Sequence, residues 1–249
     1  MVTRIVLVFL LASALTSRAQ VLLSDDFESG GTLDPNRWVV GASVDGSSVG
    51  QSGGSAVFFQ HGVLRSAQAM AQDIVVTGTV RIGTAGDELM VVVRAAAAGN
   101  THWGDHAGIV FELSRWGGDT LGIFYLDESG GYYSLAQKSY ALTTGASYQF
   151  TVTVQGSQLS FAINGTTELT ATSSLSYGNY MTIANSDGAG ATSYLDAISV
   201  AAVPEPATAA FAGGLCGLGV VAIRRWRRGG DSSCAAGPSG PRCGDERVA

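Results

Sequence analysis

The chain is poor in charged residues, in lysine and, over most of its length, in cysteine. Charged side chains make up 14% of the 249 residues, and Lys138 is the single lysine. The stretch 20–203 has no cysteine, which excludes a disulfide framework there and leaves stability to a hydrophobic core. The three cysteines are Cys216, Cys234 and Cys243. The last two lack histidine partners, so the pattern does not indicate a metal site.

Positive charge is scarce in the same stretch. Residues 20–203 contain sixteen Asp and Glu against six Arg and Lys, a formal charge of −10. Such an acidic domain argues against nucleic acid as a partner, whereas calcium or a neutral polysaccharide remains compatible. Glycine is abundant, with 34 residues. Many Gly, Ser and Thr with few Lys and Glu favour short strands joined by tight turns over long helices.

The first nineteen residues have the pattern of a secretory signal peptide. Arg4 supplies a positive charge, residues 5–15 form an apolar run, and Ser17 and Ala19 place small residues where a signal peptidase reads. We therefore expect a signal helix within 1–19, cleavage after Ala19, and export. An uncleaved membrane anchor is the alternative.

The C-terminal part contains a second apolar segment between two short motifs. Residues 207–223 are seventeen residues without charge, about 25 Å as a helix, which is close to a hydrocarbon core of about 30 Å. The motif before it is Val203, Pro204, Glu205 and Pro206, and the motif after it is the cluster Arg224, Arg225, Arg227 and Arg228. Arginines at this position stop translocation, which predicts a transmembrane helix with its C-terminal end in the cytoplasm.

This order of motifs resembles the PEP-CTERM sorting domain of Gram-negative bacteria over residues 203–228. The resemblance implies an exosortase-type processing enzyme as a partner, transient anchoring in the membrane, and then a place at the cell surface or in the medium. Many proteins with this tail are linked to exopolysaccharide and to biofilm or floc formation. The polar extension 229–249 departs from the family, which usually ends soon after the arginines, and its composition predicts disorder in the cytoplasm.

The middle of the chain has the two-residue periodicity of β-strands. Apolar residues alternate with polar ones over 148–154 and 159–163, and Gln155-Gly156 predicts a hairpin turn between them. Residues 89–93 are apolar throughout, which is typical of a strand buried on both faces. With no convincing amphipathic helix, the fold class is all-β: one antiparallel β-sandwich over 20–202.

Several segments resemble the concanavalin A-like jelly rolls, which include laminin G-like domains and laminarinase-type glycoside hydrolases. They are residues 24–28 and 33–38 at the opening, the hairpin at 161–165, and the closing strand at 194–200. Trp38 lies in the opening segment, and we expect it to be a core aromatic rather than a ligand platform.

The carboxylates do not form the motif of a laminarinase-type active site. That chemistry needs two carboxylates on one strand face, about 5 Å apart, and no Glu-x-Asp occurs in the chain. Asp87 and Glu88 are adjacent and should point to opposite faces. Glu112 could line a groove but has no partner two residues away. We therefore predict a non-catalytic protein; a glycan-degrading or glycan-modifying enzyme, with acids from distant strands meeting in space, is the alternative.

Two kinds of ligand site remain as candidates. The jelly-roll resemblance implies one structural Ca²⁺ between the opening segment and the closing strand, with Asp196 as the side-chain ligand; otherwise Asp196 caps a turn or pairs with an arginine. Exopolysaccharide is the candidate ligand for exposed aromatic rings, since a pyranose face stacks on them. The candidate rings are Trp103, Trp116, Tyr132 and Tyr133.

Overall fold

The computed structural model describes residues 19–28, 31–41, 46–83, 88–96, 107–115, 118–185 and 192–203. These residues form strands and turns and contain no helix, so the predicted all-β class is confirmed for them. No helix among the described residues is long and apolar enough to cross a bilayer. The predicted signal helix, the helix at 207–223 and the extension at 229–249 lie outside the described residues.

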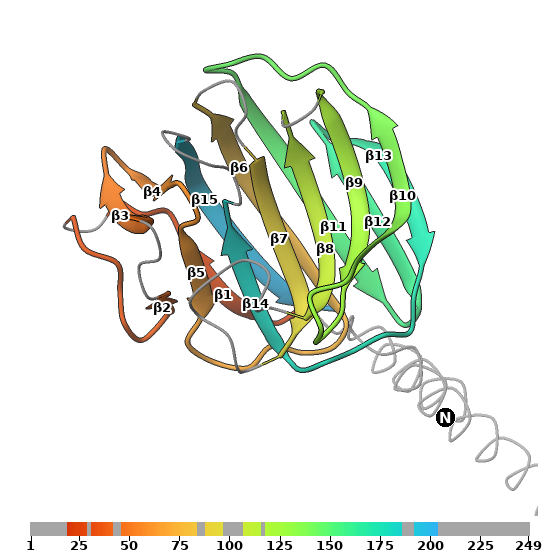
Figure 1. Ribbon diagram of the computed structural model, residues 1–249. Coiled ribbons are helices and arrows are strands. Elements are labelled where there is room, and N and C mark those ends of the chain that lie inside the picture. The colour runs from red at the N-terminus through yellow and green to blue at the C-terminus, as the bar shows by residue number, and fades with distance from the viewer. Residues whose placement is uncertain are drawn as a thin grey trace, which may run out of the picture. The chain divides into compact units, whose positions relative to one another are not determined.

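The strands form two antiparallel sheets (Figure 1). The eight-stranded sheet has the order β13 (Thr166–Thr172), β12 (Gln158–Ile163), β11 (Ser147–Gln155), β6 (Ile74–Ile82), β15 (Thr192–Ala202), β4 (Ser55–Phe59) and β3 (Ser48–Ser52), and β1 (Val21–Asp25) pairs with β15. The seven-stranded sheet has the order β10 (Tyr132–Ser139), β9 (Thr120–Leu126), β8 (Gly108–Ser114), β7 (Glu88–Ala95), β14 (Tyr180–Ala184), β5 (Val63–Ser66) and β2 (Trp38–Val40).

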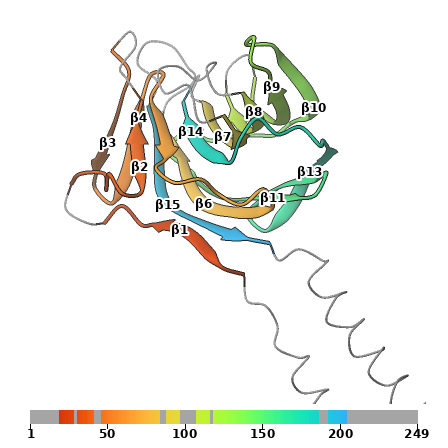
Figure 2. The same cartoon turned by 90° about the horizontal axis from the view of Figure 1, so that it is seen from below.

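The eight-stranded sheet curves around the seven-stranded one (Figure 2). The main core lies between them and contains six phenylalanines or tryptophans from widely separated parts of the chain, together with many aliphatic side chains. The aromatic members are Phe27, Trp38, Phe58, Phe111, Phe150 and Phe161. Trp38 is 2% exposed, which confirms its predicted place in the core.

Local sequence explains the best-predicted hairpins. β11 and β12 pair in register, with Val152 opposite Phe161, around the predicted turn at Gly156. The next turn uses Asn164 and Gly165, which both have a positive φ, of 51° and 80°. Two consecutive residues of positive φ match the right-handed twist of the flanking strands, and Asn-Gly adopts that conformation at little cost.

The first and last strands lie side by side, as the jelly-roll resemblance implied. β1 pairs antiparallel with β15, with Leu23 opposite Val200. The Ala202 N–H donates to the Gln20 carbonyl at 2.8 Å, and the Val203 N–H donates to the Asp73 carbonyl at 3.0 Å. The two ends of the sandwich are therefore hydrogen-bonded to the rest of the sheet. This ordered structure extends to Val203, the first residue of the predicted sorting motif.

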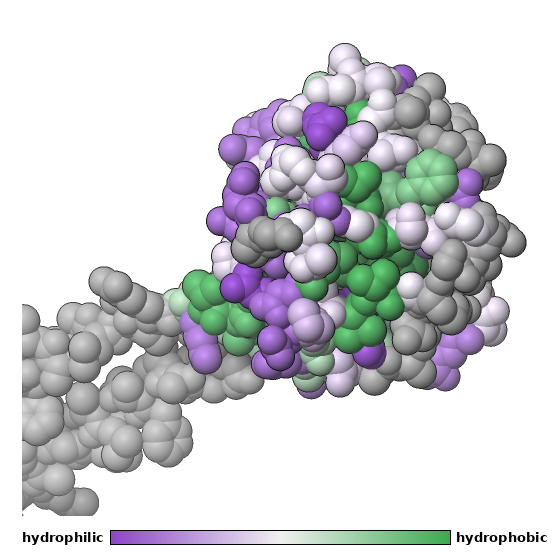
Figure 3. All heavy atoms as spheres, turned by 90° about the vertical axis from the view of Figure 1, so that its left-hand side faces the viewer, coloured by the Kyte–Doolittle hydropathy of each residue, from purple (hydrophilic) through white to green (hydrophobic). Residues whose placement is uncertain are grey.

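Exposed apolar residues gather on the side formed by β2 to β5 (Figure 3). Val40 on β2 and Phe59 on β4 are 43% and 37% exposed. Single exposed apolar side chains are normal on soluble proteins, so we assign no role to this side.

Strand β7 is buried on both faces, as the unbroken apolar run at 89–93 predicted, and its neighbour β8 is buried on both faces as well. One face contributes to the main core. The other supports a second, smaller apolar cluster that includes Met90, Val92, Val110 and Phe124. We call this face of the seven-stranded sheet, turned away from the eight-stranded sheet, its outer face.

Candidate functional site

The residues predicted to form sites are distributed over separate parts of the chain. Trp103 and Trp116 lie outside the described residues, as do Pro204, Glu205, Pro206, Arg224, Arg225, Arg227 and Arg228. Tyr132, Tyr133 and Asp196 are described. The structure places the two tyrosines on opposite faces of β10 and Asp196 on the other sheet.

Tyr132 lies over the outer face and belongs to a chain of contacts that starts at a glycine. A Cβ atom at Gly122 would collide with the Phe124 ring, so the missing side chain lets that ring lie along β9. Tyr132 stacks on Phe124, with ring centroids 4.5 Å apart and planes 23° apart. The Tyr132 hydroxyl donates a hydrogen bond to Glu112 on β8. Tyr132 is therefore a half-buried part of a network and not an open platform for a sugar.

Glu112 is a buried acid with a second acid beside it. Its side chain is hydrogen-bonded to Glu88 on β7 and to Ser114, and the residue is 6% exposed. Ionised carboxylates can only accept hydrogen bonds, so the bond between the two glutamates requires a shared proton. Burial raises the pKa of Glu112, against the opposing effect of its hydrogen bonds to Glu88, Tyr132 and Ser114. Burial and the Glu112 charge in turn raise the pKa of Tyr132.

The Glu88–Glu112 pair comes from the pleat and register of two neighbouring strands. Glu88 lies opposite Ser114, and Glu112 lies opposite Met90, so the two acids are diagonal neighbours on one face. From the sequence alone, each of the two acids could point to this face of its own strand. The sequence does not give the register between β7 and β8 that brings the two side chains together. For that reason the pair was not predicted, although Glu112 was singled out.

The geometry of this pair differs from that of a glycosidase. In those enzymes two carboxyl groups stand about 5 Å apart or more on either side of the bond that breaks. Here the two groups bond to each other, and Glu112 has almost no contact with solvent. A sugar ring has no space between them in this arrangement.

Tyr133 projects from the opposite side of β10. Its ring stacks on Tyr125 of β9, with centroids 4.6 Å apart and planes 16° apart, and it is 46% exposed. Its hydroxyl is hydrogen-bonded to Asp127, which follows β9 directly. Of the two tyrosines that the sequence suggested as sugar contacts, Tyr133 has the exposure that a stacking contact requires.

Asp196 lies on β15 at an irregularity in its pairing with β6. Its carboxylate accepts a hydrogen bond from the Ser55 hydroxyl at 2.7 Å. Glu28 lies against Gly54, the residue before Ser55, so the acidic opening segment approaches the same turn. These groups all present oxygen atoms, which is the donor type that calcium prefers.

Asp25, another acid of the opening segment, already has hydrogen-bond partners. It accepts the Trp38 indole N–H at 2.7 Å and the Phe27 backbone N–H at 3.0 Å, and Arg37 lies 3.5 Å away. In the described part of the chain no group of three or more His, Cys, Asp and Glu side chains comes together. A calcium ion at Asp196 would therefore depend on backbone carbonyls and water for most of its ligands.

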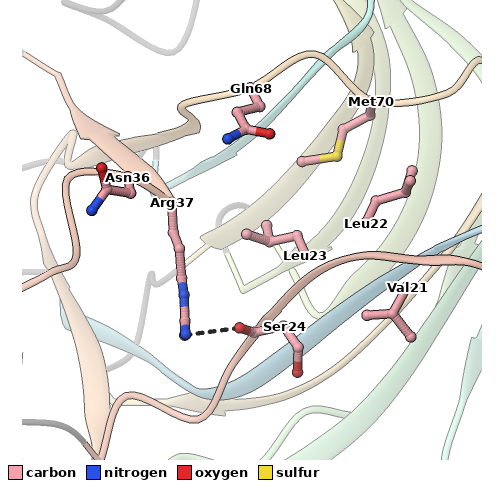
Figure 4. Close-up of a pocket in the computed structure, with 8 residues that line it drawn as sticks. All are labelled: Val21, Leu22, Leu23, Ser24, Asn36, Arg37, Gln68 and Met70. Atoms are coloured by element: carbon pink, nitrogen blue, oxygen red, sulfur yellow. Dashed lines mark hydrogen bonds between the residues drawn. The ribbon is translucent and has the colours of Figure 1, made fainter.

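Two shallow grooves border β1. One, of about 290 Å³, has apolar residues such as Leu23 and Met70 beside polar Arg37 and Gln68 (Figure 4). Arg37 is tied down there, since its guanidinium donates to the Ser24 carbonyl at 2.9 Å. The other, of about 390 Å³, crosses the face of the eight-stranded sheet that is turned away from the core, and its lining includes Thr77, Gln149 and Ser199.

Comparison with known proteins identifies the fold. No family model matches the chain, and no curated protein matches it. A Bacillus subtilis protein of unknown function with a galectin-like fold aligns with a TM-score of 0.58 at 14% identity, over 75% of this chain and 97% of its own. LamAcat from Zobellia galactanivorans aligns with a TM-score of 0.54 at 13% identity, over 73% of this chain and 97% of its own.

A non-specific endo-β-1,3(4)-glucanase of family GH16, SCLam, aligns with a TM-score of 0.54 at 12% identity, over 76% of this chain and 92% of its own. Likeness at such low identity shows that the chain has the two-sheet jelly-roll fold. One jelly roll can carry unrelated functions, so function has to be argued from the site.

Proposed function

We propose that the protein is an exported, non-catalytic protein of the bacterial cell surface or extracellular matrix, sorted by a PEP-CTERM tail, and that it binds exopolysaccharide. The observation that carries the non-catalytic part is the pairing of Glu88 with Glu112. The outer face of the sheet holds two acids, but they satisfy each other and Glu112 is buried. The jelly-roll likeness to endo-β-1,3(4)-glucanases supports a glycan as the ligand, while the closed carboxyl pair disfavours hydrolysis.

A glycan array combined with a reducing-sugar assay tests this proposal on the mature secreted protein. We expect binding to one or more polysaccharides without release of reducing ends. Glu112→Gln is the matched variant, because it removes the acid and keeps the side-chain shape. Hydrolysis by the wild type that is lost in Glu112→Gln would overturn the non-catalytic proposal and establish the glycan-degrading alternative.

One observation favours that alternative. A buried acid with a raised pKa, hydrogen-bonded to a tyrosine, has the character of a proton donor, and such groups occur often in active sites. Structural networks also raise pKa values, so the assay above decides between the two functions. The same assay with a polysaccharide that the protein binds gives the most sensitive comparison.

Sorting is tested by reporters and by mass. A reporter fused after Val203 should be active outside the cytoplasm, and one fused after Arg228 should be active inside it. If a sorting enzyme acts, the released protein should end near Pro206, and replacement of Pro204, Glu205 and Pro206 by alanine should leave the full chain in the membrane. Ala249 on the released protein would contradict processing.

Calcium is the cofactor that we propose at Asp196. With calcium roughly a hundredfold above its dissociation constant, the native state gains about 2.7 kcal/mol. The melting temperature of a domain of this size should rise by about 5–11 °C. Asp196→Asn should remove most of that rise, whereas Asp25→Asn serves as a control for an acid used elsewhere. A melting curve that a chelator leaves unchanged would contradict the proposal.

A further inference from the structure

The start of β10, directly after the turn from β9, holds an aromatic ring that is both exposed and fixed. Tyr133 is 46% exposed, although its ring stacks on Tyr125 almost in parallel, with planes 16° apart. An exposed tyrosine usually has rotational freedom that ligand binding would have to remove. Because Tyr125 already holds one side of this ring in place, a ligand that binds here removes little side-chain conformational entropy.

The hydroxyl of Tyr133 is fixed as well. A Cβ atom at Gly131 would lie 2.6 Å from both the Tyr133 hydroxyl oxygen and the ring atom Cε2. Any side chain at this position would therefore displace the ring, so the glycine is needed for the ring to lie across the turn. The hydroxyl is hydrogen-bonded to Asp127, whose charge raises the pKa of Tyr133 and keeps the hydroxyl protonated.

Asp127 is held in the ionised form by the turn. It accepts hydrogen bonds from the Ser129 hydroxyl at 2.7 Å, the Gly131 N–H at 2.8 Å and the Ser129 N–H at 2.9 Å. These bonds lower the pKa of Asp127, with the Ser129 hydroxyl as the largest cause. A fixed hydrogen-bond acceptor thus stands beside the fixed ring.

We infer that Tyr133 and Asp127 form a subsite for one pyranose ring of a neutral glycan. The inference rests on the proposed glycan-binding function and names the site where it acts. The Tyr133 ring offers an apolar surface for the C–H face of the sugar, and the Asp127 carboxylate accepts a hydrogen bond from a sugar hydroxyl. A few fixed polar groups beside an aromatic surface are typical of small-ligand sites. Asp127 and Glu128 would repel uronic acids, so the ligand is neutral.

Titration calorimetry of the mature secreted protein with neutral and acidic oligosaccharides tests this subsite. The probes are laminaritetraose, cellotetraose and mannotetraose, with tetragalacturonate as the acidic probe and tetramethylammonium as a cationic one. We expect at least one neutral probe to bind. Tyr133→Ala should weaken that binding about tenfold, the effect of losing a contact near 1.4 kcal/mol.

Two further variants test whether the position of the Tyr133 ring matters and whether any exposed ring would serve. Gly131→Ala keeps Tyr133 but displaces its ring, so binding should weaken in the same direction. Phe59→Ala removes an exposed aromatic ring on β4 and should leave binding unchanged. Thermal unfolding of each variant identifies any loss of fold.

Failure of the subsite, failure of the glycan-binding function and a wrong ligand class give different results. Equal binding by wild type and Tyr133→Ala would overturn the subsite and leave the glycan-binding function intact. If wild type binds none of the oligosaccharides and no polysaccharide on the array, the proposed function fails and the subsite with it. Binding of tetramethylammonium or tetragalacturonate in preference to every neutral probe would overturn the assigned ligand class.

Discussion

Tyr132 and Tyr133 are consecutive residues with opposite environments. Tyr132 lies over the outer face of the seven-stranded sheet, stacked on Phe124 and bonded to the buried acid Glu112. Tyr133 lies on the other side of β10, stacked on Tyr125 and bonded to Asp127 in an exposed turn. Both follow the same local plan, a tyrosine stacked on an aromatic ring of β9 with its hydroxyl on a carboxylate. Burial alone makes one a structural network and the other an accessible surface.

The largest expected difference between the two regions concerns packing. Phe124→Ala removes the ring that supports Tyr132 and should cost about 3–5 kcal/mol of unfolding free energy, the usual range for a buried phenylalanine. Tyr133→Ala removes an exposed ring and should leave the unfolding free energy close to that of the wild type. Urea titration of both variants measures the difference. A larger loss in Tyr133→Ala than in Phe124→Ala would reverse the assignment of roles.

The sequence predicted the parts of this comparison that depend on local pattern. Alternation along 148–154 and 159–163, the Asn164-Gly165 turn, and the doubly buried run at 89–93 are all confirmed. These features depend on neighbouring residues in the chain, so a single sequence contains the information that specifies them.

The candidate site depends on information that is not local. Adjacent tyrosines must point to opposite faces, but the sequence does not show which face is covered. The strand β10 itself was not predicted, because its residues Tyr132–Ser139 lack a clear apolar alternation. Likewise, the pairing of Glu88 with Glu112 requires the register of β7 with β8, which tertiary packing sets. Asp127 and Glu128 are adjacent acids, and nothing in the local sequence shows that the turn holds Asp127 against Tyr133.

The next expected difference arises when only the hydroxyl group of each tyrosine is removed. Tyr132→Phe leaves the stack on Phe124 and removes a hydrogen bond to a buried acid, which should cost about 1.5–3 kcal/mol. Tyr133→Phe removes a hydrogen bond that water can replace, so its effect on the unfolding free energy should be much smaller. Urea titration at neutral pH gives both values. If the two variants are equally stable, the Tyr132 hydroxyl is not part of a buried network.

The smallest and most diagnostic difference is the pH dependence of stability. Because the pKa of Glu112 is raised above 4.5 in the folded state, the folded protein retains a proton that the unfolded chain has released. Its contribution to stability is complete below about pH 4.5 and is lost as the pH rises through the folded-state pKa. The groups that face it are Glu88 on β7, Tyr132 on β10 and its own neighbour Ser114.

Asp127 has the opposite dependence. Its pKa is lowered below 3.8, so its contribution is complete above that value and is lost as the pH falls through the folded-state pKa. Glu112→Gln mimics the protonated acid and should flatten the decrease in stability as the pH rises above about 4.5, whereas Asp127→Asn should change only the acid end. Urea midpoints of wild type and both variants across this range provide the measurement. A wild-type profile that Glu112→Gln does not alter above pH 4.5 would show that Glu112 ionises as freely as an exposed acid, and the contrast between the two tyrosine regions would then rest on packing alone.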